Sequence, residues 1–209
     1  MTFRYLRTRD DKSSFAPFNT GVESRDRRKD LMRKVTFGAA VSLDNFIAAD
    51  NDAMDWLLFG DGTVEVMNEY WPRIDTILMG RKTWEVSRQN APPESSSVDG
   101  GGIATYVFSR TLTPDAAPGA TVISENAGDF VRELKSQPGK EICMMGGGDL
   151  ARSLFEADVI DEVGLNIHPV ILGSGVPLFH LMGRRIELEL LECRPFQNGC
   201  VYVIYRVKH

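Results

Sequence analysis

The sequence contains few of the residues that build metal centres and covalent active sites. Only three cysteines and three histidines occur among its 209 residues, and they show no spacing typical of zinc ligands or of a catalytic triad. Cys143, Cys193 and Cys200 leave one thiol unpaired in any disulfide arrangement, although Cys193 and Cys200 flank a turn-like segment and could face each other across a hairpin. We therefore predict reduced thiols and no bound metal.

Long hydrophobic runs are also missing. No apolar stretch approaches the roughly 20 residues that a membrane-spanning helix needs. The first residues lack the apolar core of a secretion signal, and their interspersed acids are unlike an organellar transit peptide. We therefore predict a cytoplasmic protein with no membrane partner.

Positive charge is scarce outside the first 34 residues. The formal net charge at pH 7 is −5, yet residues 1–34 carry ten Lys or Arg and five Asp or Glu, a net charge of +5. Residues 35–209 therefore carry a net charge of −10. Since nucleic-acid affinity depends on neutralising phosphates with Lys and Arg, so acidic a body disfavours a nucleic-acid partner. A small molecule is the expected partner.

The chain divides into a polar beginning and one patterned body. Residues 1–33 are arginine-rich and lack a hydrophobic period, which predicts a flexible N-terminal extension. Met32 directly precedes the first strand pattern and could be the initiator; an arm that clasps a neighbouring subunit is the alternative. Residues 34–209 are expected to form a single domain, because no repeat or linker interrupts them.

Short apolar runs alternate with amphipathic segments through most of this body, which is typical of an α/β protein. In the predicted helix 61–71, Val64, Met67 and Trp71 recur at helical spacing, and residues 91–102 are predicted to form a loop. The last three strands have no helix between them, which indicates antiparallel strands closing a mostly parallel central sheet flanked by helices. Strands are predicted at 34–42, 76–79, 105–108, 121–123, 141–145, 162–167, 186–194 and 200–207, and helices at 61–71, 81–87, 128–136 and 148–157.

Two glycine-containing segments stand where a buried strand is expected to turn into a helix. They are Met-Gly-Arg-Lys-Thr-Trp at 79–84 and Met-Met-Gly-Gly-Gly-Asp-Leu at 144–150. Bare backbone N–H groups and a positive helix end could face one pyrophosphate from both sides, with cations from Arg81 and Lys82 and a hydroxyl from Thr83. The alternative for each glycine alone is close packing or a positive φ angle. The second segment also fits the Rossmann fingerprint, but the antiparallel strands after it exclude that context.

Several motifs together resemble a known superfamily. In this order they occur in dihydrofolate reductases: Ala-Ala-Val-Ser-Leu-Asp at 39–44, Ile-Leu-Met-Gly-Arg-Lys-Thr-Trp at 77–84, Val-Phe-Ser-Arg at 107–110 and Gly-Gly-Gly at 146–148. The Ser-Leu-Asp variant, with Asp-Glu at 161–162 and Pro-Val-Ile-Leu-Gly-Ser-Gly-Val-Pro-Leu-Phe at 169–179, is more similar to the C-terminal reductase domain of the bacterial riboflavin-biosynthesis deaminase-reductase and its stand-alone relatives. The resemblance covers residues 34 to about 207 and implies a dihydrofolate-reductase-like fold.

The resemblance also implies NADPH as cofactor. Ser109 and Arg110 would meet the adenosine 2′-phosphate, which suits a guanidinium and a hydroxyl. Asp149 departs from dihydrofolate reductases, which commonly carry a cation there. Its carboxylate would repel a pyrophosphate, or it could cap the following helix, which we favour. The implied cofactor residues are Ala40 and Ile47 beside the nicotinamide, and Gly80, Arg81, Lys82, Thr83, Ser109, Arg110, Gly146, Gly147, Gly148, Asp149 and Leu150 along the rest of the dinucleotide.

Candidates on the substrate side follow the first strand. Asp44 and Asp55 could deliver a proton directly or through a held water, and Trp56 could stack on a flat ring. The alternatives are a turn acid for Asp44, and a capped loop with a core tryptophan for the other two. Folate reductases hold the pterin with a carboxylate on the helix before the Met-Gly-Arg turn, so the resemblance implies that role for Glu65 or Glu69 of the predicted helix 61–71. A solvated helix face is the alternative for each. His168 is expected to be structural.

The sequence therefore leaves two functions open. The first is an NADPH-dependent reductase that transfers hydride to a small pteridine, pyrimidine or ribosylamino-type substrate, like dihydrofolate reductase or 5-amino-6-(5-phosphoribosylamino)uracil reductase. The second is a non-catalytic nucleotide-binding or dimeric scaffold protein that retains the fold. The resemblance also implies a homodimer through the C-terminal strands.

Overall fold

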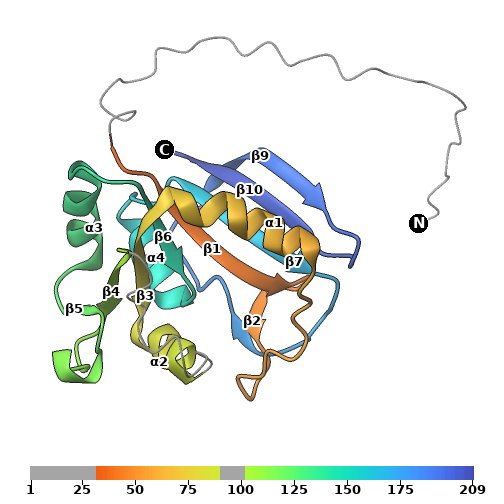
Figure 1. Ribbon diagram of the computed structural model, residues 1–209, viewed down its shortest axis with the longest axis horizontal. Helices are drawn as coiled ribbons and strands as arrows, with labels where there is room; N and C mark the ends of the chain where they lie inside the picture. Colours follow the sequence, from red (N-terminus) through yellow and green to blue (C-terminus); the bar gives the residue numbers. More distant parts are fainter. Residues whose placement is uncertain (1–31, 90–101) are drawn as a thin grey trace, which may run out of the picture. The chain divides into compact units, whose positions relative to one another are not determined.

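The computed structural model describes residues 32–89 and 102–209 (Figure 1). Residues 32–209 belong to one compact unit. Nearly all of the predicted extension and of the predicted loop at 91–102 lies outside the described residues. The strands are β1 (Val35–Ser42), β2 (Phe46–Ala48), β3 (Ile74–Gly80), β4 (Ala104–Phe108), β5 (Thr121–Ile123), β6 (Glu141–Met145), β7 (Glu162–His168), β8 (Val176–Pro177), β9 (Glu187–Pro195) and β10 (Val201–Lys208). The helices are α1 (Asp61–Tyr70), α2 (Arg81–Gln89), α3 (Ala127–Ser136) and α4 (Gly148–Glu156), with 3-10 turns η2 (Trp71–Arg73) and η4 (Pro114–Ala116).

The central sheet has eight strands in the order β5-β4-β3-β6-β1-β7-β10-β9. The six strands from β5 to β7 are parallel to their neighbours, whereas β10 is antiparallel to both β7 and β9. Parallel neighbours need crossover connections, which α1, α2, α3 and α4 provide. The predicted α/β domain, with a mostly parallel sheet and antiparallel C-terminal strands, is confirmed.

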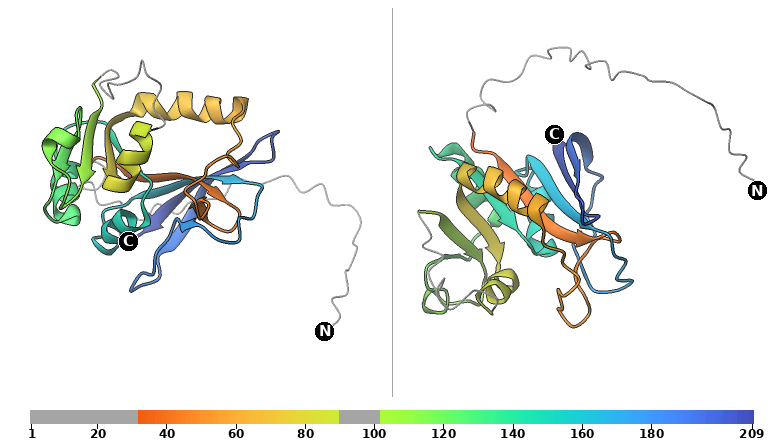
Figure 2. Two further views of the ribbon diagram at one scale, coloured as in Figure 1. Left: turned by 90° about the horizontal axis from the view of Figure 1, so that it is seen from below. Right: turned by 45° about the vertical axis from the view of Figure 1, so that its right-hand side comes forward.

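The alternation of β1 separates two cores on opposite faces of the sheet. Val35, Phe37 and Val41 are fully buried against a cluster that includes Leu154 and Phe155 of α4. The other face carries a second cluster around Trp84 of α2, with Tyr70 at the end of α1 packed against it. The left view of Figure 2 shows α1 and α4 on opposite sides of the sheet.

Arg33 belongs to the folded unit rather than to the extension. Its side chain is buried and forms an ion pair with Asp75, a 2.6 Å hydrogen bond to Thr76 Oγ1 and a 2.7 Å hydrogen bond to the carbonyl of Lys140. The packed part of the chain therefore includes Arg33, which directly precedes the predicted boundary at residue 34. A single arginine gives no hydrophobic period, so the sequence pattern did not reveal this anchor.

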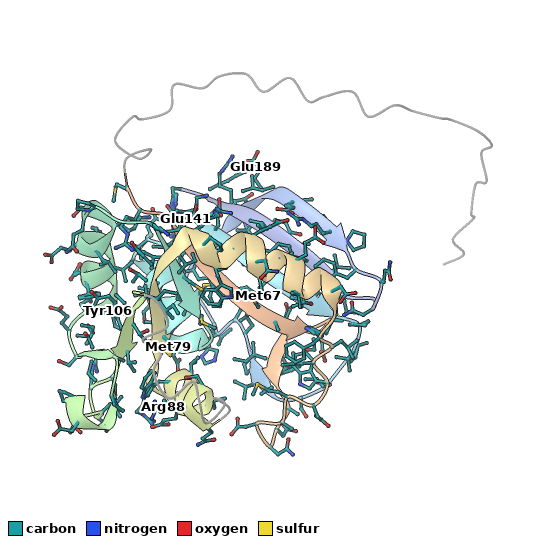
Figure 3. All side chains as sticks on the ribbon, viewed as in Figure 1. Met67, Met79, Arg88, Tyr106, Glu141 and Glu189 are labelled. Atoms are coloured by element: carbon teal, nitrogen blue, oxygen red, sulfur yellow. The ribbon has the colours of Figure 1, made fainter. Side chains whose placement is uncertain are left out.

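Helix α1 turns a different side to the sheet than its apolar spacing indicated. Val64 and Met67 are 56% and 44% exposed, whereas Thr63 is 9% exposed and Tyr70 packs on the core. Met67, labelled in Figure 3, contacts the indole of Trp71, whose Nε1 lies 3.1 Å from its sulfur. The apolar stripe on α1 therefore does not face the core, in contrast to α4, whose apolar side chains are buried as expected.

Two short strands were not predicted. β2 and β8 pair with each other in a separate antiparallel sheet, with Phe46 opposite Pro177. Gly175 beside them has φ +144°, and a Cβ there would lie 2.1 Å from the carbonyl oxygen of Ala48. β2 and β8 have too few residues to show alternation, and unlike the short β5 they are not made up of β-branched residues.

The structure bears on the expectations for thiols, membrane-spanning segments and metal sites. All three cysteines are free, and Cys193 lies opposite Val203 rather than opposite Cys200. No helix in residues 32–89 and 102–209 has the length and apolar character to cross a bilayer. Within the same residues, no cluster of three or more His, Cys, Asp or Glu side chains could hold a metal ion.

Candidate active site

The two glycine turns emerge side by side from neighbouring strands. β3 and β6 are parallel and pair Met79 with Met145, so Gly80 and Gly146 leave the same edge of the sheet together. A Cβ on Gly146 would lie 2.5 Å from Thr83 Oγ1, which places the second turn directly against the first. The structure thus brings together the two predicted halves of a phosphate site.

The second turn leaves the beginning of α4 open. Gly146 and Gly147 have φ angles of +65° and +45°, a backbone region that favours glycine. Gly147 is the residue that precedes α4, and no side chain caps the helix there. The first N–H groups of a helix have no partner within it and suit an anion. Leu150, also predicted to border the cofactor, is buried in the core beneath this turn.

The cations of the first turn differ in their contacts. Arg81 forms an ion pair with Glu85 one helical turn later, with 2.7 Å between Nη1 and Oε1. Lys82 is exposed, and no ion pair joins it to another described residue. The hydroxyl of Thr83 faces Gly146. A charge already paired in part attracts an anion less strongly, so Lys82 is the freer cation at this turn.

Ser109 and Arg110 follow β4, the neighbour of β3 on the side away from β6. Gly80 pairs with Phe108, which puts both residues at the edge where the glycine turns emerge. Ser109 Oγ accepts hydrogen bonds from the backbone N–H groups of Thr111 (3.1 Å) and Leu112 (2.9 Å) and so fixes its own turn. The Arg110 side chain is exposed. The serine shapes the loop, and the arginine is the group left to meet an anion.

An open strip of backbone runs along the sheet between α1 and the glycine turns. Among the described residues, a Cβ on Gly38 would meet no atom within 4 Å. The same holds for Gly80 at the end of β3, although its Cβ would point to the opposite face of the sheet, because Gly38 and Met79 both pair with Met145. Gly38 pairs with Met145, and Ala40, two residues further along the same face of β1, pairs with Asn166 of β7. Ile47 of β2 is half-buried beyond the end of β1. A flat ring can approach the sheet most closely along this strip.

A hollow of about 330 Å³ lies elsewhere, beside α2. Its lining includes none of the residues predicted to bind a cofactor or a substrate, and it misses both glycine turns. For this reason we place the site at the open strip and not in the hollow. The hollow is lined by Trp84, Glu85, Arg88, Gln89, Leu112, Ala116 and Pro118.

Asp44 is held as a turn acid. Its carboxylate accepts hydrogen bonds from Ser42 Oγ (2.6 Å) and from the backbone N–H groups of Leu172 (3.2 Å) and Gly173 (2.8 Å). The bond from Ser42 is the main reason that the pKa of Asp44 is lowered, and the two backbone bonds add to it. A carboxyl group whose pKa is lowered is ionised at neutral pH and is a poor direct proton donor.

Asp55 and Trp56 lie in the loop between β2 and α1. Asp55 is exposed, whereas the half-buried Trp56 donates from Nε1 to the carbonyl of Ala53 at 3.3 Å. The indole meets the ring of His168 edge to face, with 5.3 Å between centroids. Trp56 therefore packs against β7 and is still partly exposed. Of the two candidate acids Asp44 and Asp55, Asp55 is the one whose side chain is accessible, and it lies next to Trp56 in the chain.

Two residues of β7 were not proposed as site residues. His168 is buried, its Nδ1 accepts a 3.1 Å hydrogen bond from the Leu58 N–H, and burial lowers its pKa. The Asn166 amide lies 3.3 Å from His168 Nε2, and its buried Oδ1 has no protein partner. In either orientation of the amide, one end stays unsatisfied beside Ala40. The signal for this in the sequence is one asparagine within an otherwise apolar strand.

The acids of α1 point away from the open strip. Glu65 is exposed and, at about 100° per residue, lies roughly opposite the buried Thr63. Glu69 accepts both guanidinium bonds of Arg194 in the β9–β10 hairpin, at 3.1 and 2.7 Å, which lowers its pKa. The structure therefore does not support Glu65 as a ligand of the substrate, and the solvated-face alternative fits it better.

Asp149 does not cap α4 as expected. Its carboxylate instead lies 2.9 Å from His180 Nδ1, with Arg152 Nη2 at 3.9 Å. His180 comes from the segment that follows β8 and rests against Gly148, where a Cβ would lie 2.5 Å from its Cδ2. The second glycine turn thus has an Asp–His pair at its side.

Comparison with known proteins gives a matching family model and a related sequence, each over most of the chain. The family model described as "RibD C-terminal domain" matches residues 33–202. The uncharacterized protein YyaP of Bacillus subtilis (strain 168) is 34% identical over 182 residues, which are 83% of this chain and 94% of YyaP.

Solved structures share the fold at lower identity. A Shewanella sp. PV-4 protein named for riboflavin biosynthesis matches with a TM-score of 0.68 and 24% identity, over 84% of this chain and 99% of that one. Dihydrofolate reductase from Enterococcus faecalis, solved with NADP(H), matches with a TM-score of 0.60 and 17% identity, over 84% and 97% of the two chains. These matches establish a reductase-type fold. With most of its length matched by the family model, the chain belongs to the RibD C-terminal domain family.

Proposed function

We propose that this protein is a cytoplasmic NADPH-dependent reductase that transfers hydride to a small pteridine, pyrimidine or ribosylamino-type substrate. The observation that carries the proposal is the contact between the two glycine turns, where Gly146 lies against Thr83 at the edge shared by β3 and β6. One pyrophosphate would meet the N–H groups of both turns there. Similarity to a dihydrofolate reductase solved with NADP(H) supports the same cofactor.

The residues present fit such a cofactor. The open beginning of α4 and the backbone of Gly80 would hold the pyrophosphate, and Lys82 would add positive charge. Arg110 would face the 2′-phosphate beyond β4. Bound NADPH would supply the hydride from its nicotinamide ring. The open strip at Gly38 and Ala40 would let that ring lie flat on β1.

On the substrate side, the chain would act mainly by orientation. Asn166 offers a buried polar end beside Ala40, which a ring bearing N–H donors and acceptors would satisfy. Trp56 would border the same ring, and Asp55 or a water that it holds would deliver the proton. Since Asp44 is ionised and occupied by the 172–173 backbone, its part would be to shape the loop. Catalysis would then rest on proximity and fixed dipoles.

Equilibrium titration with NADPH and NADH tests the cofactor assignment. We expect NADPH to bind about tenfold or more tightly than NADH, because Arg110 pairs with the additional phosphate. In Arg110→Ala this preference should disappear while NADH affinity stays unchanged. Absorbance loss of the reduced nicotinamide, followed with pteridine, pyrimidine and ribosylaminopyrimidine acceptors, then tests turnover. Failure of the wild-type protein to bind either dinucleotide would refute the proposal.

A second candidate is a nucleotide-binding protein without catalysis. It is favoured by the acids of α1, which do not reach the open strip, and by Asp44, whose carboxylate is already committed to Ser42 and the 172–173 backbone. Tight NADPH binding with no oxidation by any acceptor would support this candidate over a reductase.

The predicted homodimer has a structural counterpart at the sheet edge. β9 is the outermost strand, and Leu188, Leu190 and Leu191 on it are 40%, 54% and 40% exposed. Exposed leucines on an unpaired edge are a recurring feature of subunit contacts. We propose that two copies associate through β9. Sedimentation should show a dimer that Leu190→Lys converts to a monomer, with Leu181→Lys, at an exposed leucine outside the central sheet, as the control.

A further inference from the structure

Asp149 presents an apparent conflict in the second glycine turn. Its side chain is 80% exposed at the first turn of α4, close to the place proposed for a pyrophosphate. A carboxylate there should repel an anion. The structure shows this carboxylate engaged by His180, whose Nδ1 lies 2.9 Å from its Oδ1.

The backbone at Gly148 is shaped around the same histidine. A Cβ on Gly148 would lie 2.5 Å from His180 Cδ2, 2.8 Å from its Nε2 and 2.8 Å from the carbonyl oxygen of Leu178. Only glycine permits this approach of the imidazole to the helix start. The ring edge that carries Nε2 therefore rests at the first turn of α4, and the other nitrogen is tied to Asp149.

We propose that Asp149 is a positioning residue that holds His180 as a phosphate-binding group for the cofactor. With Nδ1–H donating to the carboxylate, the ring is oriented, and in its protonated form Nε2–H is a charged donor next to the N–H groups of α4. An imidazolium at this place would offset the carboxylate, and a bound pyrophosphate would then meet a positive group. This inference rests on the proposed function, since it assigns residues to the proposed cofactor.

A purely structural pair makes different predictions. If the contact only fastens the segment after β8 to α4, its loss lowers thermal stability and leaves dinucleotide affinity unchanged. If Asp149 acts by repulsion, Asp149→Asn tightens binding. If Asp149 positions His180, the same substitution weakens binding, although it removes a negative charge next to an anion.

The experiment is fluorescence titration of the full chain with NADPH and with NADH, alongside thermal melting without ligand. We expect Asp149→Asn and His180→Ala each to weaken both dinucleotides roughly tenfold, as loss of one charge-assisted hydrogen bond implies. The double variant Asp149→Asn/His180→Ala should bind the dinucleotides no more weakly than the single variant with the lower affinity, because the two residues act as a unit. His180→Asn, which keeps a polar group without the charge, should also bind weakly even if His180→Ala fails to fold.

Asp129 provides a matched control. It lies in the first turn of α3, is 74% exposed and pairs with Arg132 three residues later, as Asp149 does with Arg152, but no histidine contacts it. Asp129→Asn should leave both affinities within twofold of wild type. Arg110→Ala should affect NADPH alone, which separates the 2′-phosphate from the pyrophosphate.

The outcomes separate this inference from the proposed function. Wild-type binding combined with unchanged or tighter binding in Asp149→Asn would overturn the positioning role and leave the reductase proposal intact. Unchanged affinity in both His180 variants would do the same. A wild-type protein that binds neither dinucleotide would overturn both proposals.

Discussion

The two halves of the candidate site are built in different ways. The cofactor half is centred on the backbone of two glycine turns that follow paired residues of β3 and β6, to which side chains such as Lys82 and Arg110 add charge. The substrate half consists of side chains from the loop after β2, from α1 and from β7, which come together only in the folded chain. A site made of backbone leaves its mark on a short stretch of sequence, whereas a site made of distant side chains does not.

The largest expected effect concerns the backbone half. Gly80→Val adds a side chain where a Cβ meets no atom of residues 32–89 and 102–209 within 4 Å, so we expect folding to be unaffected. The added methyl groups would occupy the space that we assign to the phosphate, and NADPH affinity should fall by roughly 100-fold. Titration together with thermal melting measures both quantities.

Gly62→Ala is a control in which a substitution at glycine should impair folding and not NADPH binding. A Cβ there would lie 2.5 Å from the ring of Phe196, so melting temperature should fall while NADPH affinity of the folded protein is retained. A Gly80→Val variant with normal NADPH affinity would show that no ligand approaches the first turn.

Asn166→Ala should affect the substrate half alone. Removing the amide with its unsatisfied end should raise the KM for a heterocyclic acceptor roughly tenfold, since a buried polar contact with the substrate is lost. The dissociation constant of NADPH should not change. If Asn166→Ala weakened NADPH binding as much as it raised the KM for the acceptor, the cofactor and the substrate would share this residue in one site.

Asp44 and Asp55 separate structure from chemistry in the substrate half. Asp55→Asn should lower kcat by roughly 100-fold if it, or its water, delivers the proton. Asp44→Asn should leave most of kcat but lower the melting temperature, since it weakens the link to the 172–173 backbone. Unchanged turnover in the double variant would exclude both acids as the proton source.

The lowered pKa of Asp44 gives this contrast a pH dependence. A carboxyl group whose pKa is lower in the folded than in the unfolded chain stabilises the fold above its unfolded pKa of about 4. That contribution is lost as pH falls through the folded pKa. The difference in melting temperature between wild type and Asp44→Asn should therefore be full at neutral pH and should shrink in acid.

Much of the fold was readable because it rests on local pattern. The eight main strands and four helices begin and end within two residues of their predicted ends, and the uninterrupted C-terminal strands indicated the antiparallel edge correctly. Strands β2 and β8 were missed, because they show no period and, unlike the short β5, are not made up of β-branched residues.

The errors in the site have a shared physical cause. Val64 and Met67 have the spacing of a core stripe, yet they are exposed on the side of α1 opposite the hairpin contacts of Gly62 and Glu69. A helix bordering an open site and a helix covering a core show the same period. The role of His180 at the second glycine turn depends on a contact between residues 31 apart, which no local pattern encodes.

The smallest expected effect is at Glu65, and it tests which side of α1 faces the substrate half. Glu65→Gln alters an exposed side chain roughly opposite the buried face of α1, so kcat, KM and NADPH affinity should all stay within about twofold of wild type. Met67→Gln changes the side of the same helix that faces away from the hairpin. Because we propose that the substrate lies on that side of α1, this more polar side chain should raise KM by a few-fold. A large loss in Glu65→Gln with a silent Met67→Gln would mean that α1 presents its other side to the substrate, and the substrate half would then have to be placed beneath the β9–β10 hairpin.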